Sequence, residues 1–165
     1  MSTKKLIIIS AIVITLLMST SSKAFSLISK FEGLSLKPYL DTNGKYSIGY
    51  GTQKNWDEKR PVLPTDRINE DTAQRWLKYE IADRMPKVKS MIKVPVSQNA
   101  LDSLTSFAYN IGLNAFASST LLRKLNAGVD KKIVANEFDR WTKANGKTLP
   151  ALVQRRTLEK ALFLK

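Results

Sequence analysis

Two carboxylic acids and a hydroxyl lie close together near the start of the chain, and together they could cleave an acetal. Glu32 stands nine positions before Asp41, and Ser47 follows six positions later. One acid could protonate a leaving oxygen while the other, as a carboxylate, activates water. The alternative is that Asp41 is a turn residue that caps its own backbone. The spacing alone leaves both interpretations open.

The residues around these groups predict how they are positioned. Apolar residues at 27, 28 and 31 recur at helical spacing, so Glu32 is expected near the end of a helix. Residues 39–40 and 46–48 flank Asp-Thr-Asn-Gly, a strong turn signal between two short strands. A helix end that faces a hairpin can hold two carboxylates on opposite walls of one cleft.

Three ordered motifs extend this pattern over most of the chain. Residues 31–41 read Phe-Glu-Gly-Leu-x-Leu-x-x-Tyr-x-Asp, and residues 46–51 read Tyr-Ser-Ile-Gly-Tyr-Gly. Together they resemble the active-site segment of the phage-type lysozymes, the endolysins of glycoside hydrolase family 24. Residues 106–126 resemble that family's central helix and the turn after it, and residues 141–159 resemble its C-terminal signature. The resemblance covers residues 25–164.

The resemblance implies a fold and an activity. The fold is α+β and mostly helical: a lysozyme-like, two-lobed arrangement with a small β-hairpin lobe and a larger helical lobe. A long helix joins the lobes, and the cleft lies between them. The implied enzyme is an exported muramidase that hydrolyses the β-1,4 bond between N-acetylmuramic acid and N-acetylglucosamine in peptidoglycan. It would invert the anomeric carbon, degrade the bacterial wall and lyse the host cell.

The resemblance also implies a role for each site residue. Glu32 is expected to be the general acid, Asp41 an ionised carboxylate that orients water, and Ser47 the hydroxyl that holds this water from the other side. Tyr109 and Asn110, at the end of the central helix, are expected to face the cleft and contact the glycan. To hold a proton near neutral pH, Glu32 would need an apolar setting, which neighbouring aromatic side chains could supply.

The sequence departs from the family pattern at one of these residues and at a neighbouring position. Ser47 stands where the family usually has Thr, which keeps the hydroxyl but loses a side chain that is stiff at χ1. Thr52 follows Gly51 where the family often has His, and the chain contains no His at all. A mechanism or stabilising pair that relies on imidazole is therefore excluded.

The amino-acid composition limits which cofactors and binding partners we expect. With no Cys and no His, the chain offers neither a disulfide nor the usual zinc ligands, and it lacks a nucleotide-binding glycine loop. We therefore expect no metal and no cofactor. The net charge of +13 attracts polyanions such as nucleic acid, anionic lipid or acidic wall polymers. Without a long basic run or base-stacking signature, we expect no specific nucleic acid. The expected partner is the peptidoglycan glycan strand, bound by a monomer.

The N-terminus reads as an export element. Lys4 and Lys5 precede a mostly apolar run over residues 6–18, and Ser22-Lys23-Ala24 has the small-x-Ala form of a signal-peptidase site. Residues 1–24 are thus predicted to be a signal peptide, and residues 25–165 a lysozyme catalytic domain. The protein would reach the periplasm or the outside. The rival is an uncleaved signal-anchor: residues 4–23 would tether the enzyme transiently to the inner membrane before release. The sequence favours cleavage, because a run so rich in Leu and Ile should leave a bilayer reluctantly.

The remaining elements follow from periodicity and caps. A long helix is expected over residues 69–92, kinked or divided at Pro86. Further helices are expected over residues 97–112, from Asp130 to Trp141, and from Pro150 onward.

Other side chains admit two interpretations each. Residues 53–66 form a polar connector whose Trp56 either stacks on sugar or packs locally, and packing is favoured. Arg155 and Arg156 are expected to be structural or surface charges rather than catalytic groups.

Two other functions remain open at this point. A lytic transglycosylase would also use one Glu but would leave anhydro-muramic ends. A non-catalytic cationic protein could bind walls or membranes through charge and apolar surface alone.

Overall fold

The computed structural model describes residues 22–41 and 44–165, and this part of the chain is mostly helical. In chain order the helices are α2 (Ser22–Glu32), α3 (Glu70–Met91), α4 (Gln98–Ile111), α5 (Leu113–Ala117), α6 (Thr120–Asn126), α7 (Lys131–Ala135), the 3-10 helix η1 (Asn136–Arg140) and α8 (Pro150–Leu164). The strands are β1 (Ser35–Leu40), β2 (Tyr46–Gly49), β3 (Lys54–Asn55), β4 (Arg60–Pro61), β5 (Lys143–Ala144) and β6 (Lys147–Thr148).

The strands form antiparallel pairs, and the first pair is the predicted hairpin. β1 and β2 are aligned so that Tyr39 lies opposite Ser47. β3 pairs with β4 inside the segment expected to be a connector, and β5 pairs with β6 just before α8. A small core of Ile48, Val62 and Trp76 fixes β2 and the β4 segment against α3.

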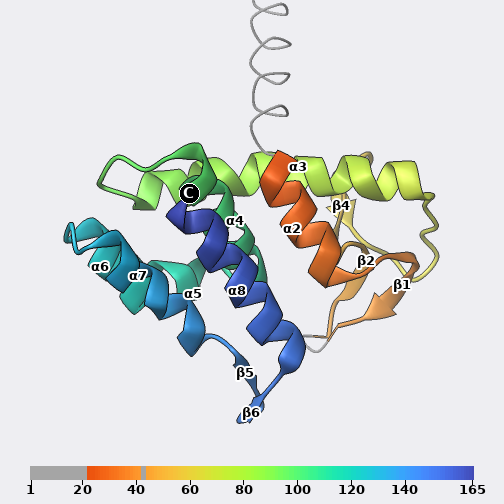
Figure 1. The fold of residues 1–165 in the computed structure, drawn as a ribbon. Coiled ribbons are helices and arrows are strands. Elements are labelled where there is room, and N and C mark those ends of the chain that lie inside the picture. The colour runs from red at the N-terminus through yellow and green to blue at the C-terminus, as the bar shows by residue number, and fades with distance from the viewer. Residues whose placement is uncertain (1–21, 42–43) are drawn as a thin grey trace, which may run out of the picture.

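Helix α3 joins the strand-bearing lobe to the helical lobe. In Figure 1 it runs across the top of the molecule, above the strands on one side and the helices on the other. Asn69 caps its start by accepting a hydrogen bond from the amide of Thr72. The long helix expected over residues 69–92 is confirmed, and of the two outcomes predicted at Pro86, a kink or a division, the division is wrong.

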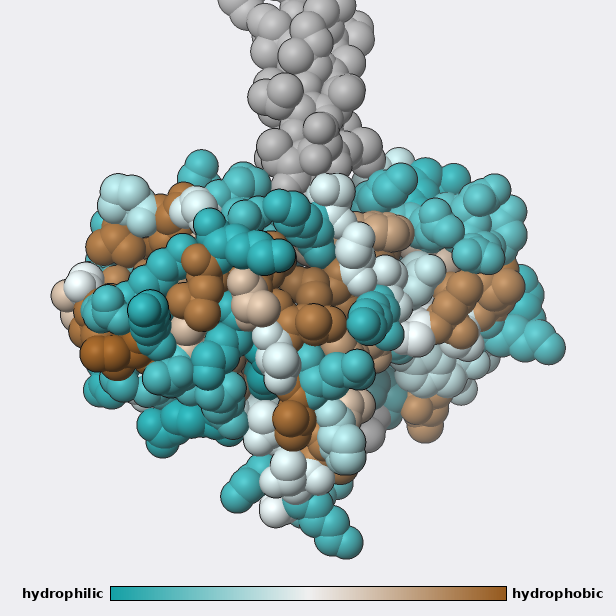
Figure 2. All heavy atoms as spheres, in the orientation of Figure 1, coloured by the Kyte–Doolittle hydropathy of each residue, from teal (hydrophilic) through white to brown (hydrophobic). Residues whose placement is uncertain are grey.

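The helical lobe is built around α4, whose residues 100–108 are all buried. Helices α2, α3 and α8 all contact it. Phe107 makes edge-to-face ring contacts with three aromatic side chains: Phe116, Phe138 and Trp141. The surface seen in Figure 2 is largely hydrophilic, with apolar side chains scattered over it.

One helix differs from the sequence expectation. The helix expected from Asp130 to Trp141 ends at Ala135 and continues as the 3-10 helix η1, so Trp141 lies beyond it. The boundary predicted after Ala24 stays a prediction; in the structure Ala24 lies within α2 and is fully buried in the main core.

The rest of the predicted export segment, residues 1–21, lies outside the described residues. Within residues 22–41 and 44–165, no helix is both long enough and apolar enough to cross a membrane.

Candidate active site

A cleft of about 710 Å³ lies where the strand-bearing and helical lobes meet. Its walls come from the end of α2, from β1 and the turn after it, from the segment around β3, from α3 and from the end of α4. Four of the five predicted site residues line it: Glu32, Asp41, Tyr109 and Asn110. The fifth, Ser47, is fully buried behind this wall.

Glu32 is the last residue of α2. The helix ends there because Gly33 adopts a positive φ of 70°, the left-handed conformation that terminates many helices. Glu32 Oε1 accepts a hydrogen bond from Nη1 of Arg155, on α8, at 2.6 Å. The Glu32 side chain is 22% exposed and that of Arg155 only 2%. Although Phe31 lies beside Arg155, the setting of Glu32 is not the purely apolar one expected, because a guanidinium holds one of its oxygens.

Asp41 closes the hairpin turn and also presents its side chain to the cleft. Its amide donates to the carbonyl of Lys45, and its carbonyl accepts from the amide of Gly44. Its Oδ2 accepts hydrogen bonds from Ser47 Oγ and from Gln53 Nε2, each at 3.3 Å. Asp41 therefore both stabilises the turn through its backbone and presents its carboxylate to the cleft, so the two interpretations offered by the sequence are compatible.

Ser47 reaches the cleft only through its neighbours. It lies opposite Tyr39 in the hairpin, and its hydroxyl contacts both Tyr39 and Asp41. Burial, with the charges of Asp41 and Glu32 after it, raises the pKa of Tyr39. The Ser47 side chain is fully buried, and its hydroxyl lies 3.3 Å from Asp41 Oδ2.

Tyr109 and Asn110 lie at the end of α4. The Tyr109 hydroxyl donates to the carbonyl of Tyr50 at 2.8 Å, which ties α4 to the strand-bearing lobe. Burial raises the pKa of Tyr109, so the phenol stays protonated and keeps this donor. Asn110 is exposed, and its Oδ1 accepts from Arg156 at 3.1 Å.

A buried cluster of charges supports Glu32 from behind. Glu159 is fully buried and accepts from Ser106 Oγ at 2.7 Å and from Arg155 Nε at 3.1 Å. Nε of Arg156 lies 2.9 Å from its other oxygen. Burial lowers the pKa of Arg156 to about 10. Of the two alternatives predicted for Arg155 and Arg156, structural or surface charge, the structural one is correct.

A family model for phage lysozyme matches residues 29–159, which is most of the chain. This chain belongs to the phage lysozyme family. The resemblance and the lysozyme-like fold predicted from the sequence are thereby confirmed.

Individual lysozyme relatives agree. The endolysin of Acyrthosiphon pisum secondary endosymbiont phage 1 is 41% identical over 150 residues, covering 88% of this chain and 98% of its own length. The endolysin of Bacillus phage B103 is 42% identical over 149 residues, or 89% of this chain, but this match spans only 54% of that longer relative.

Solved lysozyme structures share the fold. The muramidase domain of SpmX from Asticaccaulis excentricus superposes with a TM-score of 0.76 at 32% identity, over 87% of this chain and 96% of that one. The crystal structure of a P22 lysozyme mutant superposes with a TM-score of 0.73 at 35% identity, over 87% and 97%.

Sequence reasoning missed a third carboxylate in this lysozyme cleft, that of Glu80 on α3. Its Oε1 accepts from Thr52 Oγ1 at 2.6 Å and from Trp56 Nε1 at 3.1 Å. Thr52 occupies the position where the family often has His, so here a hydroxyl contacts the acid on α3. Glu80 lies four residues, or one helical turn, after the buried Trp76, so both side chains lie on the same face of α3. This spacing was the sequence signal that could have placed Glu80 near the strand-bearing lobe.

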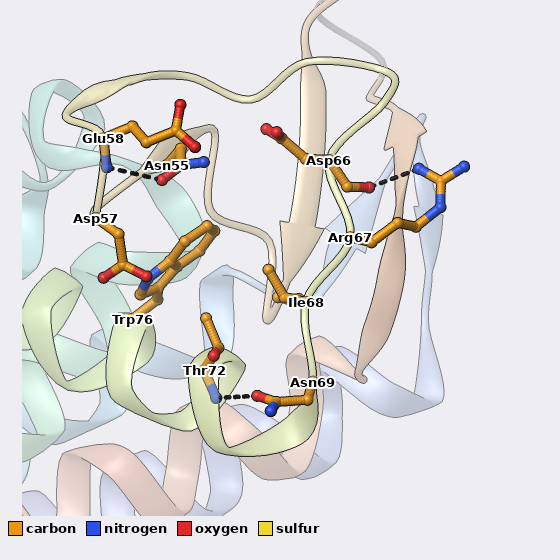
Figure 3. A pocket seen from close by; sticks show the side chains of 9 residues that line it. All are labelled: Asn55, Asp57, Glu58, Asp66, Arg67, Ile68, Asn69, Thr72 and Trp76. Atoms are coloured by element: carbon orange, nitrogen blue, oxygen red, sulfur yellow. Dashed lines mark hydrogen bonds between the residues drawn. The ribbon is translucent and has the colours of Figure 1, made fainter.

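A second pocket, of about 420 Å³, also contains acidic residues but is a poor catalytic candidate (Figure 3). Figure 3 shows the side chains of Trp76 and Ile68 pointing toward one another across it. Each of its acids has a cationic partner: Asp57 pairs with Arg75, and both Glu58 and Asp66 pair with Arg60. The hydrogen bonds from Arg60 lower the pKa of Asp66 to about 2. Each of these carboxylates is therefore already paired with an arginine.

Proposed function

We propose that this chain is an endolysin: a muramidase that hydrolyses the β-1,4 bond between N-acetylmuramic acid and N-acetylglucosamine in peptidoglycan. Its membership of the phage lysozyme family supports the reaction class. The observation that carries the proposal is that Glu32 and Asp41, from different elements, line the same cleft of about 710 Å³. A cleft of this size is large enough to hold sugar units of a glycan strand.

Glu32 is the proposed general acid. Arg155 holds its Oε1, while its Oε2 accepts no hydrogen bond from residues 22–41 or 44–165 and can approach the glycosidic oxygen. The glycan itself supplies the apolar surroundings, because it displaces water from the cleft as it binds. Glu32 then gives its proton to the leaving oxygen as the glycosidic bond breaks, which frees the C4 hydroxyl of the next sugar.

Asp41 is the proposed base. Its carboxylate stabilises the positive charge that develops on the sugar ring, and it takes a proton from the water that attacks the anomeric carbon. This attack from the face opposite the leaving group inverts the configuration. Ser47 and Gln53 both donate to Oδ2 and so orient the carboxylate. We assign Ser47 a positioning role, which replaces the water-holding role expected from the sequence.

We assign Tyr109 and Asn110 to glycan contact. The Tyr109 hydroxyl is committed to the carbonyl of Tyr50 and Arg84 lies over the ring, so we assign the sugar contact to the part of the ring that Arg84 leaves uncovered. Asn110 is exposed, and its amide nitrogen can donate to an acetamido carbonyl of the substrate.

Glu32→Gln tests the reaction. We expect the release of reducing ends from purified peptidoglycan to fall by about 10²–10⁴-fold, the usual contribution of a general acid. The matched control is Glu70→Gln, which replaces an exposed acid in the first turn of α3. This variant should hydrolyse peptidoglycan at the wild-type rate. A Glu32→Gln enzyme that keeps a tenth of the rate would remove Glu32 from the acid role.

The products and the lysis assay separate the alternatives. Mass spectrometry of digested peptidoglycan should show reducing N-acetylmuramic acid ends. Anhydro-muramic ends would instead mean a lytic transglycosylase. Wall suspensions treated with Glu32→Gln should stay turbid, since clearing without hydrolysis would mean a cationic wall- or membrane-binding protein. Proton NMR of the first products should show the inverted anomer.

We further propose that the protein is exported with its N-terminal segment retained. The sequence favoured cleavage after Ala24, but Ala24 is fully buried in the core and lies inside α2. Cleavage there would remove a residue of the folded domain. The SAR-endolysin of Bacteriophage PS34, 32% identical over 133 residues, is a relative. The intact mass of protein from cells decides the matter: loss of 24 residues would refute retention.

A further inference from the structure

Two cationic side chains line the same cleft as the carboxylates, and the proposed hydrolysis uses neither of them. Arg84 comes from α3 and Lys54 from β3. A positive charge at a substrate cleft needs an explanation when the sugars themselves are uncharged.

The Arg84 guanidinium is held by an aromatic ring more than by hydrogen bonds. Its central carbon lies 4.9 Å from the centre of the Tyr109 ring. Its Nη2 lies 3.7 Å from Glu80, and Nη1 is 3.4 Å from the carbonyl of Ala108, so both polar contacts are long. Its buried Nε has no partner in the described chain. A guanidinium has five N–H donors, so most of those on Arg84 remain unused.

Lys54 is held in the same way. Its ammonium lies 3.9 Å from the centre of the Trp56 ring, and it forms no ion pair with a carboxylate of the described residues. Trp56 is itself fixed, because its Nε1 donates to Glu80 at 3.1 Å. An aromatic ring can orient a cation without consuming its N–H donors, so both side chains are positioned and still able to bind.

Glu80 gives Arg84 only one ion-pair contact, and that contact is long. One of its oxygens already accepts from Thr52 and Trp56, and only the other approaches Arg84, at 3.7 Å. Glu32 and Asp41 line the same cleft, but among the described residues no ion pair joins either of them to Arg84 or Lys54. Arg84 therefore keeps N–H donors for an anion, and the planar fork of an arginine suits a carboxylate best.

We propose that Arg84 and Lys54 form an anion subsite for a carboxylate on the muramoyl branch of the glycan. This inference rests on the proposed function. In peptidoglycan the lactyl group of N-acetylmuramic acid carries a short peptide with free carboxylates, whereas the glycan backbone is neutral. The subsite recognises the wall polymer by this branch and thereby selects it over uncharged glycans.

The test compares Arg84→Gln with Arg75→Gln on three substrates. Arg75 lies on the same helix, is 43% exposed and pairs with Asp57 away from the cleft, so it controls for the loss of one positive charge. The substrates are purified peptidoglycan, the same peptidoglycan with its carboxylates amidated, and amidase-stripped strands, in which removal of the peptide frees the lactyl carboxylate. The readout is the initial rate of reducing-end release at subsaturating substrate.

On untreated peptidoglycan we expect Arg84→Gln to be at least 10-fold slower than Arg75→Gln. On amidated peptidoglycan the ratio between the two variants should approach one. If the ratio between the variants persists on stripped strands, the subsite accepts a carboxylate at the lactyl position. If the ratio disappears there, the ligand is a carboxylate of the peptide. Lys54→Gln should show the same selectivity, which guards against an Arg84 variant that folds poorly.

The subsite is refuted if Arg84→Gln slows hydrolysis of all three substrates equally, or of none. Failure of the proposed function looks different, because the wild type would then release no reducing ends from any of the three substrates.

Discussion

Replacing Arg155 with Met tests whether the buried charge cluster supports both the fold and the proposed acid. Arg155 donates to Glu32 at 2.6 Å, to Glu159 at 3.1 Å and to the carbonyl of Ser106 at 3.2 Å. Methionine keeps the volume of the side chain but removes every donor. The Glu159 carboxylate then remains in the core, where Arg156 and the Ser106 hydroxyl are its polar partners among the described residues.

The expected loss of stability is large. Removing one member of a buried ion pair costs about 3–5 kcal/mol. The lower end applies here, because Glu159 keeps Arg156 and its Ser106 hydrogen bond. At the size of this chain, 1 kcal/mol corresponds to about 2–4 °C in Tm, so Arg155→Met should lower Tm by about 6–12 °C. The Glu32 share is small, about 1 kcal/mol or less, because that carboxyl is partly exposed to solvent.

Calorimetry of the full-length wild type, Arg155→Met, Glu32→Gln and the double variant measures these terms as a cycle. Arg155→Met should lower Tm in both backgrounds by nearly the same amount. Its hydrolysis of peptidoglycan should also fall at temperatures where it is fully folded, because Glu32 has lost the partner that orients it. A Tm change below about 2 °C would refute the assignment of stability to this cluster.

Three further substitutions test other parts of the structure. Ser47→Ala removes a donor to Asp41 Oδ2, so kcat on peptidoglycan should fall by about tenfold, less than for Asp41→Asn; equal losses would contradict a positioning role. Thr52→Val removes a 2.6 Å hydrogen bond to Glu80 and should lower the free energy of unfolding, measured in urea, by about 1.5–3 kcal/mol. An unchanged urea midpoint would contradict this. The pKa of Asp66 is lowered from 3.8 to about 2, so its stabilisation is complete above pH 3.8 and is lost as the pH falls through 2. Asp66→Asn should therefore be less stable than the wild type at pH 5, and their thermal midpoints should converge near pH 2; a constant gap would refute this.

Much of the fold could be predicted because it depends on local signals. The N-cap residues Asn69 and Ser97 each accept the expected hydrogen bond at the start of a helix. The Asp-Thr-Asn-Gly signal marked the first hairpin correctly. The other two strand pairs could not be predicted in this way, because strands of two residues have no alternation to detect.

The helix after Asp130 shows where periodicity misleads. Val134 and Phe138 are both buried, as a continuous helix would require. The chain nevertheless tightens to a 3-10 helix after Ala135, and Ile133, expected in the same stripe, is 49% exposed. Apolar spacing of three and four residues is compatible with both helix types, so the sequence could not distinguish them.

The candidate site was predicted only as far as its motif residues. Glu32 and Asp41 were placed in one cleft because a helix end and a hairpin turn are local features. Arg155 could not be paired with Glu32, because 123 positions separate them and no periodic pattern links the two. Arg156 and Glu159 are charged side chains on the final helix, a pattern that usually marks a solvated face, and only packing against α4 reveals their burial.

Glu32 and the guanidinium that holds it are separated by 123 positions in the chain. During synthesis, Glu32 and Asp41 therefore leave the ribosome long before Arg155 does. A partly synthesised polypeptide has the Glu32 carboxyl without this cationic partner, and the ion pair can form only after α8 has been made.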